Sequence, residues 1–72
     1  MADLEEQLAG IAALAEPVRL RLYRFVSDQA RPVTREQAAA GLGIPVHQAK
    51  FHLDRLVADR LLTAEFAHVG PR

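Results

Sequence analysis

The stretch of sequence that decides the fold is TREQAAAGLGIPVHQAKFHLDRLV, residues 34–57. It opens with Thr34, which is a good helix N-cap, and Gln37 follows three residues later, as in a capping box. A helix is therefore predicted over about residues 35–42. Gly43 ends that helix, because glycine adopts the left-handed conformation that a helix C-terminus often requires.

A second helix is predicted from Pro45 or Val46 to about Asp59, because apolar residues recur there with helical spacing. Its inward face is expected to consist of Ala49, Leu53, Leu56 and Val57, with His52 packed at the side of this face. Its opposite face is expected to carry His47, Lys50, Phe51, Asp54 and Ala58, with Gln48 and Arg55 on a flank.

A helix, a short turn with glycine and a second helix form the pattern of a helix-turn-helix motif. The two helices of such a motif approach closely, which favours a small residue in the first helix, here Ala39. The turn needs a glycine, here Gly43, and an apolar residue after it, here Ile44, fills the space between the helices. The same pattern also fits an ordinary helical hairpin within a small bundle.

Two further helices are predicted before this motif. An amphipathic helix is expected over residues 4–15 of an N-terminal arm, residues 1–16, with Asp3 as its N-cap. Pro17 begins the next helix, which runs to Ser27, because proline is tolerated in the first helical turn and not inside a helix. The arginines of this helix are expected to point mostly away from its apolar face.

The motif is followed by a segment with strand character. Apolar and polar residues alternate over residues 61–69, which predicts a wing strand, and Pro32 and Val33 suggest a very short edge strand before the motif. The chain, residues 1–72, is therefore expected to be a single domain with a mostly α fold. That fold is a winged helix-turn-helix of about four helices with a short or incomplete β wing.

Two segments resemble a known family. Residues 14–22, LAEPVRLRL, look like the opening helix of ArsR-type repressors, and residues 51–62, FHLDRLVADRLL, look like their recognition-helix signature. The resemblance extends over about residues 11–67. It implies a winged helix-turn-helix transcriptional regulator whose terminal helix takes part in dimerisation.

The chain departs from that family in three ways. Arg60 stands where the family usually has glycine, so we expect the helix exit to have a different geometry. The sequence ends at Arg72, after the first wing strand at most, so it is either a fragment of a longer regulator or has a degenerate wing. The family's metal sensors use cysteine-rich or histidine and carboxylate sites, and metal sensing does not transfer to a chain without cysteine.

The charge distribution permits DNA binding although the formal net charge is zero. Residues 1–16 contain four acidic residues and no lysine or arginine, whereas residues 17–60 contain eight basic residues against four acidic ones. An acidic arm thus precedes a moderately basic body. The absence of cysteine excludes disulfides and thiolate zinc sites. With no membrane-spanning stretch and no basic leader, we expect a soluble, cytoplasmic protein.

The exposed face of the second motif helix is expected to lie in the major groove of double-stranded DNA. Phe51 on this face either meets a thymine methyl group or packs under the wing or against a neighbour. The polar residues of the face either contact DNA or form an ordinary solvated surface. Helix N-termini and arginines suit phosphates. The expected base contacts are His47, Gln48, Lys50 and Phe51, and the expected phosphate contacts are Thr34, Arg35, Val46 and Arg55.

The apolar stripe of the first helix has two interpretations. It consists of Leu4, Leu8, Ile11 and Ala15, and it forms either part of the intramolecular core or half of a dimer contact. A homodimer is expected, because a chain of this size builds only a thin core alone. Two-fold symmetry would place two recognition helices about 34 Å apart, as a palindromic operator requires.

These observations predict a sequence-specific DNA-binding regulator, acting as a dimeric repressor. The alternative is a protein-interaction or dimerisation module that keeps the fold without binding DNA. No enzyme activity is expected, because Ser27, Thr34 and Thr63 occupy cap or strand positions and no catalytic constellation is visible. No cofactor or metal is expected, since His47 and His52 do not share a helix face. The sequence does not identify the effector.

Overall fold

The computed structural model describes residues 2–69, with the side chains of residues 4, 5 and 7–69. It contains four helices: α1 (Ala2–Leu14), α2 (Pro17–Ser27), α3 (Arg35–Leu42) and α4 (Val46–Ala58). The predicted mostly α, four-helix fold is therefore confirmed. The bounds of α2 and α3 agree with the prediction. Helix α1 begins at Ala2, so Asp3 lies inside the helix and the prediction that it is the N-cap was wrong.

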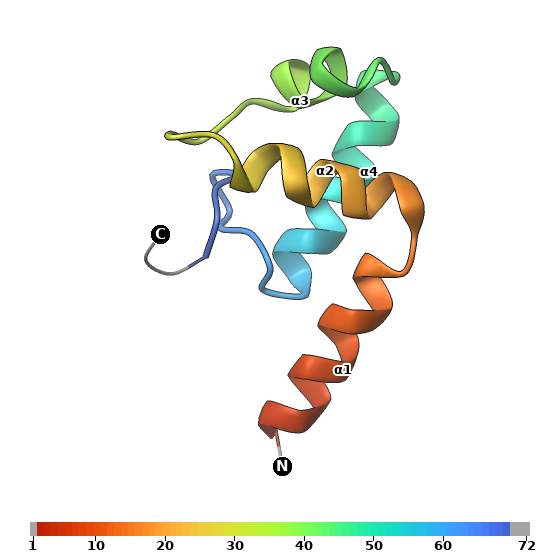
Figure 1. Cartoon of the computed structure of the whole chain (residues 1–72), viewed down its shortest axis with the longest axis vertical. Coiled ribbons are helices and arrows are strands. Elements are labelled where there is room, and N and C mark those ends of the chain that lie inside the picture. The colour runs from red at the N-terminus through yellow and green to blue at the C-terminus, as the bar shows by residue number, and fades with distance from the viewer. Residues whose placement is uncertain (1, 70–72) are drawn as a thin grey trace.

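Helices α2, α3 and α4 form a body around one hydrophobic core (Figure 1). Each contributes one apolar face, and burying a leucine or valine side chain stabilises the fold by roughly 1.5–3 kcal/mol. The residues of the core that are buried on these three helices and the loops beside them are Leu22, Val26, Val33, Ala38, Ala39, Ala49, Leu53, Leu56 and Leu62.

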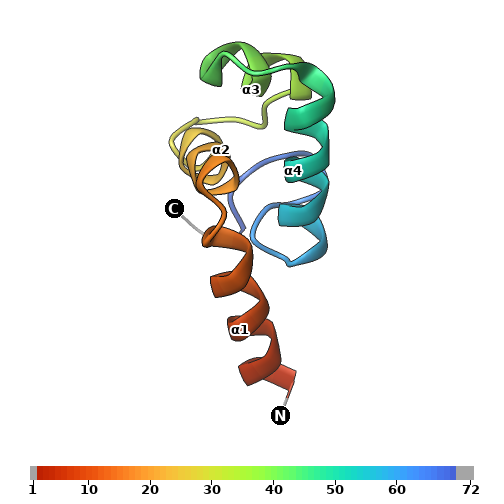
Figure 2. The ribbon, with the colours of Figure 1, turned by 90° about the vertical axis from the view of Figure 1, so that its right-hand side faces the viewer.

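Helix α1 projects away from this body (Figures 1 and 2). Only its C-terminal half packs, through the buried residues Gly10 and Ala13, and a Cβ atom on Gly10 would lie 3.4 Å from Cδ2 of Leu61. Leu4, Leu8 and Ile11 are 53%, 57% and 68% exposed. The interpretation that this stripe belongs to the intramolecular core is therefore wrong. None of the helices within residues 2–69 is long and apolar enough to cross a membrane.

The junction between α1 and α2 is set by two residues. Pro17 occupies the first turn of α2, where its missing N–H has no helical partner to lose. Glu16 is the N-cap, and its Oε2 accepts a hydrogen bond from the backbone N–H of Arg19 at 2.7 Å. The chain therefore changes direction at residues 15 and 16 and starts a new helix at once.

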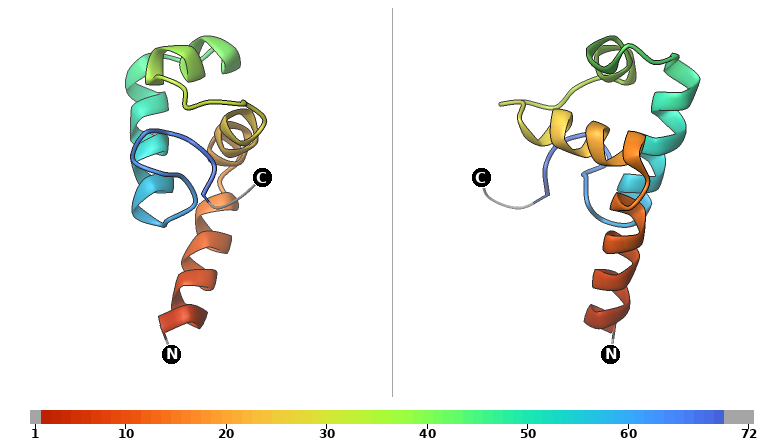
Figure 3. Two further views of the ribbon diagram at one scale, coloured as in Figure 1. Left: turned by 90° about the vertical axis from the view of Figure 1, so that its left-hand side faces the viewer. Right: turned by 45° about the vertical axis from the view of Figure 1, so that its right-hand side comes forward.

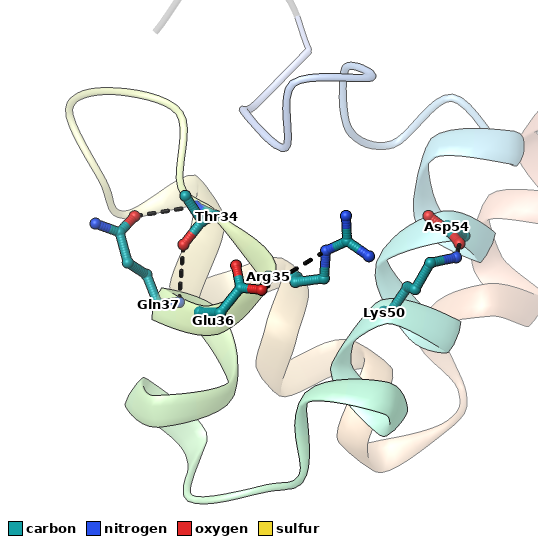
Figure 4. Close-up of polar contacts among 6 residues, drawn as sticks. All are labelled: Thr34, Arg35, Glu36, Gln37, Lys50 and Asp54. Atoms are coloured by element: carbon teal, nitrogen blue, oxygen red, sulfur yellow. Dashed lines mark hydrogen bonds and ion pairs between the residues drawn. The ribbon is translucent and has the colours of Figure 1, made fainter.

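Both ends of α3 have the predicted chemistry. Thr34 Oγ1 accepts from the Gln37 backbone N–H, and Gln37 Oε1 accepts from the Thr34 backbone N–H, both at 3.0 Å (Figure 4). Gly43 has a φ of 69°, the left-handed conformation that favours glycine. Ala39 is buried as predicted. A second small residue was missed: a Cβ atom on Gly41 would overlap the ring of Phe25 on α2.

The segment after α4 differs from the prediction. The single strand predicted over residues 61–69 was wrong, because the chain turns back on itself within it (Figure 3). Thr63 N–H donates to the Ala67 carbonyl at 2.8 Å, and one antiparallel bridge joins Leu62 to His68. Phe66 holds the turn with a φ of 60°. Such a three-residue hairpin loop ends in a left-handed residue, which is usually glycine, so the sequence gives no turn signal.

This hairpin is tied to the body by the segment before α3. The Val33 backbone N–H donates to the Phe66 carbonyl at 3.1 Å, and no strand is formed at Pro32 and Val33. Arg60, with a φ of 62°, makes the exit from α4, where the Leu61 N–H donates to the Leu56 carbonyl at 2.9 Å. Arg60 therefore takes the left-handed conformation, which is uncommon for a residue other than glycine.

Candidate nucleic-acid interface

Helix α4 has one buried face and one exposed face, as the sequence predicts. Ala49, Leu53 and Leu56 are fully buried against α2 and α3. The opposite face is open to solvent and forms a shallow depression. That depression is lined by His47, Lys50, Phe51, Asp54 and Arg55. The helix is thus fixed by its apolar side and presents polar and aromatic groups outward.

The four residues expected to contact bases are not all equivalent. His47, Lys50 and Phe51 are exposed and lie around the depression, whereas Gln48 is half-buried on the flank and does not line it. Phe51 is 64% exposed, and its ring makes a T-shaped contact with the adjacent His52 ring at a centroid distance of 5.2 Å. The alternative that Phe51 packs under the wing is therefore excluded. A large aromatic side chain stands exposed at the centre of the face.

The cations of α4 are paired with acidic residues. Lys50 Nζ lies 2.7 Å from Asp54 Oδ2 (Figure 4), and Arg55 Nε lies 2.8 Å from Asp59 Oδ2. Both cations are expected to contact DNA, and these ion pairs were not predicted. The pairing has a visible signal in the sequence, because each acid follows its cation by four residues and therefore lies on the same side of the helix.

Three of the four expected phosphate contacts lie at the starts of α3 and α4, and the fourth, Arg55, lies in the last turn of α4. Arg35 is exposed, makes only a 4.0 Å ion pair with its neighbour Glu36, and extends from α3 in the direction of α4 (Figure 4). The Thr34 hydroxyl accepts the cap hydrogen bond, which leaves its hydrogen free to donate. Val46 begins α4 after Pro45, which has no side chain that caps the helix, so backbone N–H groups of the first turn point outward.

A buried polar cluster lies beneath α4. Arg19 is buried. It donates from Nε to Nδ1 of His52 at 3.3 Å and from Nη1 to the Ala13 carbonyl at 3.3 Å. The expectation that Arg19 points away from the core was wrong. His52 is packed, as predicted. This cluster joins the end of α1, the start of α2 and the middle of α4, and so fixes the orientation of the exposed face.

Glu16 completes the cluster, and its pKa is shifted by its surroundings. Its Oε2 lies 3.7 Å from Nδ1 of His52. The hydrogen bond from the Arg19 backbone N–H, with smaller contributions from the Val18 N–H and the charges of His52 and Arg19, lowers the pKa of Glu16. The carboxylate therefore stays ionised at neutral pH, as an N-cap requires.

The part of the chain that the structure describes contains no group of three His, Asp or Glu side chains arranged to hold a metal ion. His47 is exposed on the outer face of α4, whereas His52 is buried on the inner side. The side chains that line the exposed face of α4 offer hydrogen bonding, ion pairing and apolar contact.

Comparison with known proteins agrees with this geometry. No curated protein and no solved structure matches the chain. The model of one protein family, described as a helix-turn-helix domain, matches residues 14–65. The match begins at the end of α1, includes α2, α3 and α4, and ends within the hairpin. Because it covers well over half of the 72 residues, the protein belongs to the helix-turn-helix domain family, a class of DNA-binding regulators.

Proposed function

We propose that the protein is a sequence-specific DNA-binding repressor that acts as a homodimer and inserts α4 into the major groove. The observation that carries this proposal is the exposed face of α4, which holds hydrogen-bonding and aromatic side chains around one shallow depression. An α-helix fits the major groove, where each base pair presents a distinct pattern of donors and acceptors. The resemblance of residues 14–22 and 51–62 to ArsR-type repressors supports repression, by occlusion of a promoter.

The side chains of α4 suit different base edges. Gln48 pairs with adenine through its amide, and Lys50 donates to guanine. His47, in the first turn of α4, reaches either a base edge or a phosphate. Phe51 meets the methyl group of thymine, because its exposed ring is the only large apolar group among those lining the depression.

Phosphate contacts fix the position of the protein on the duplex. The N–H groups at the start of α4, near Val46, and the hydroxyl of Thr34 serve as neutral donors. Arg35 and Arg55 supply positive charge, and Arg55 exchanges its partner Asp59 for a phosphate on binding. With few free cations on this face, non-specific attraction to DNA is weak, so most discrimination comes from the base contacts.

The dimer is supported by the exposed stripe of α1. Leu4, Leu8 and Ile11 lie on the side of the helix opposite to the buried residues Gly10 and Ala13, and Ala15 is exposed after its end. Pairing of this stripe with that of a second copy removes apolar surface from water. It also places two α4 helices on one side of the DNA, as a palindromic site requires.

The test is selection of binding sequences from a random duplex pool at two salt concentrations. We expect the wild type to enrich a palindrome and the Gln48→Ala, Lys50→Ala double variant to enrich none. The matched control is the Gln7→Ala, Arg24→Ala double variant, which also loses one amide and one positive charge, from exposed positions of α1 and α2. This control is expected to enrich the same palindrome as the wild type.

Two results contradict the proposal. Failure of the wild type to bind any duplex at low salt favours the alternative, a dimerisation module that has kept the fold without DNA binding. Binding that is equally strong for all sequences, and equally weakened in both double variants, indicates only electrostatic attraction to the DNA backbone.

A further inference from the structure

We infer that Lys50 and Asp54 act together as a unit that specifies a G·C base pair in each half of the binding site. This inference rests on the proposed function and deepens it, because it assigns a role to Asp54. Asp54 is an acidic residue in a surface expected to meet a polyanion. Its presence there needs a physical reason.

Stabilisation of the helix does not explain the pair. Both side chains are about half exposed, 52% for Lys50 and 53% for Asp54, and exposed ion pairs contribute little to the free energy of folding. The order is also the less favourable one, because an acidic residue four positions before a basic residue stabilises a helix better than the reverse. The pair therefore contributes little to the fold.

The pair is instead a donor and an acceptor held side by side in the depression. Lys50 Nζ lies 2.7 Å from Asp54 Oδ2, and His47 and Phe51 line the same depression. An ammonium group has three hydrogens, and one of them is used by Asp54. Two hydrogens remain on Nζ, and the second carboxylate oxygen of Asp54 remains an acceptor.

These remaining groups match the major-groove edge of a G·C pair. Guanine presents two adjacent acceptors, O6 and N7, and cytosine presents the N4 amino donor beside them. Lys50 donates to guanine, and Asp54 accepts from cytosine N4. At an A·T pair the acceptor N7 lies beside the N6 donor, and the thymine O4 acceptor replaces the cytosine N4 donor, so it faces the carboxylate without a hydrogen to share. We expect loss of this match to weaken binding by tenfold to a hundredfold, roughly the discrimination of one good base contact.

The pair also lowers affinity for other DNA. An unpaired Lys50 would attract phosphates of any sequence, and an unpaired Asp54 would repel them. As a pair, the two charges have no net attraction for the phosphates of the DNA backbone. They still form hydrogen bonds with a base pair that presents the matching donors and acceptors. Asp54 therefore contributes to specificity both by accepting from cytosine and by neutralising Lys50.

The first test compares the sequences enriched by the wild type, Asp54→Asn and Asp54→Ala. We expect the wild type to require one G·C pair per half-site that neither variant requires. Asparagine favours adenine through N6 and N7, so Asp54→Asn is expected to prefer A·T at that position. The matched control is Asp28→Asn, which removes the same charge from an exposed position at the end of α2 and is expected to retain the G·C requirement.

The second test replaces the cytosine at that position with N4-methylcytosine, whose methyl group occupies the donor site in the groove. Wild-type affinity should fall about tenfold, and the affinity of Asp54→Ala should not change. On unrelated duplexes, Asp54→Ala should show a salt dependence steeper by about one unit of log K against log salt, because Lys50 then contacts a phosphate.

The outcomes separate this inference from the proposed function. A wild type that enriches no sequence overturns both. A wild type that enriches a palindrome, together with Asp54 variants that keep the same base preference at every position, overturns only the role of the Lys50–Asp54 pair.

Discussion

Nε of Arg19 donates to Nδ1 of His52 at 3.3 Å, between two helices and across 33 residues of sequence, and both side chains are buried. This bond needs an imidazole nitrogen that accepts, so it forms with the tautomer that carries its proton on Nε2. The same guanidinium holds the carbonyl of Ala13. One side chain therefore connects α1 and α2 to the helix that presents the proposed DNA-binding face.

Removal of Arg19 should destabilise the fold strongly. Arg19→Ala leaves Nδ1 of His52 and the Ala13 carbonyl without this donor, and a hydrogen bond to a charged group contributes about 1.5–3 kcal/mol. We expect a loss of about that size in the free energy of unfolding, measured by urea denaturation. The control Arg24→Ala, at an exposed position of the same helix, should change it by at most about 0.5 kcal/mol. Equal losses in the two variants would contradict the structural role of Arg19.

The stability of the fold should decrease in acid through Glu16. The pKa of Glu16 is lowered in the folded protein, chiefly by the hydrogen bond from the Arg19 backbone N–H. A lowered pKa contributes stability above the ordinary glutamate pKa, about 4.3, and this contribution is lost as the pH falls through the lower folded value. Urea midpoints should therefore fall less between pH 5 and pH 3 in Glu16→Gln than in the wild type.

A suitable control for that pH series is Glu65→Gln, which removes an exposed carboxylate that caps no helix. Its midpoints should follow the wild-type decrease. If Glu16→Gln also follows the wild-type decrease, the carboxylate of Glu16 does not contribute to acid sensitivity.

The features predicted from the sequence are those fixed by neighbours in the chain. The capping box of Thr34 and Gln37 needs only a spacing of three residues, and Gly43 ends α3 through its own backbone conformation. The exposed face of α4 follows from helical periodicity. The candidate DNA contacts follow from the same periodicity, and they stay a prediction until binding is measured.

The features that the sequence did not predict depend on distant contacts or unusual backbone conformations. The burial of Arg19 requires His52, which lies 33 residues away. The hairpin after α4 turns at Phe66, a residue type that gives no turn signal, and it is held by a hydrogen bond from Val33. Lys50 and Asp54 are four residues apart, a spacing that allows an ion pair on a helix. The spacing alone does not show which partner an exposed cation adopts.

The two left-handed residues that end α3 and α4 should respond oppositely to substitution. Gly43 has a φ of 69° and Arg60 a φ of 62°, and a side chain in this conformation costs about 1–2 kcal/mol relative to glycine. Gly43→Ala should therefore destabilise the protein by about 1 kcal/mol. Arg60→Gly should stabilise it by up to about 1 kcal/mol, less what the interactions of the Arg60 side chain contribute. Thermal unfolding of both variants gives the two signs, and a destabilised Arg60→Gly would mean that those interactions exceed the backbone strain.

The proposed dimer predicts that the α1 stripe can be altered without loss of the fold. Leu8 and Ile11 are 57% and 68% exposed in the single chain, so the Leu8→Gln, Ile11→Gln double variant should keep its helical content. Its sedimentation should change from dimer to monomer, because the substitutions remove apolar area from the interface and add polar groups that pairing would desolvate. Affinity for a full palindrome should then fall toward that for a half-site, since the second helix α4 is no longer tethered.

The control is Val69→Gln, which makes an exposed apolar residue polar outside α1 and should leave the dimer intact. A double variant that still sediments as a dimer would place the two-fold contact elsewhere on the molecule.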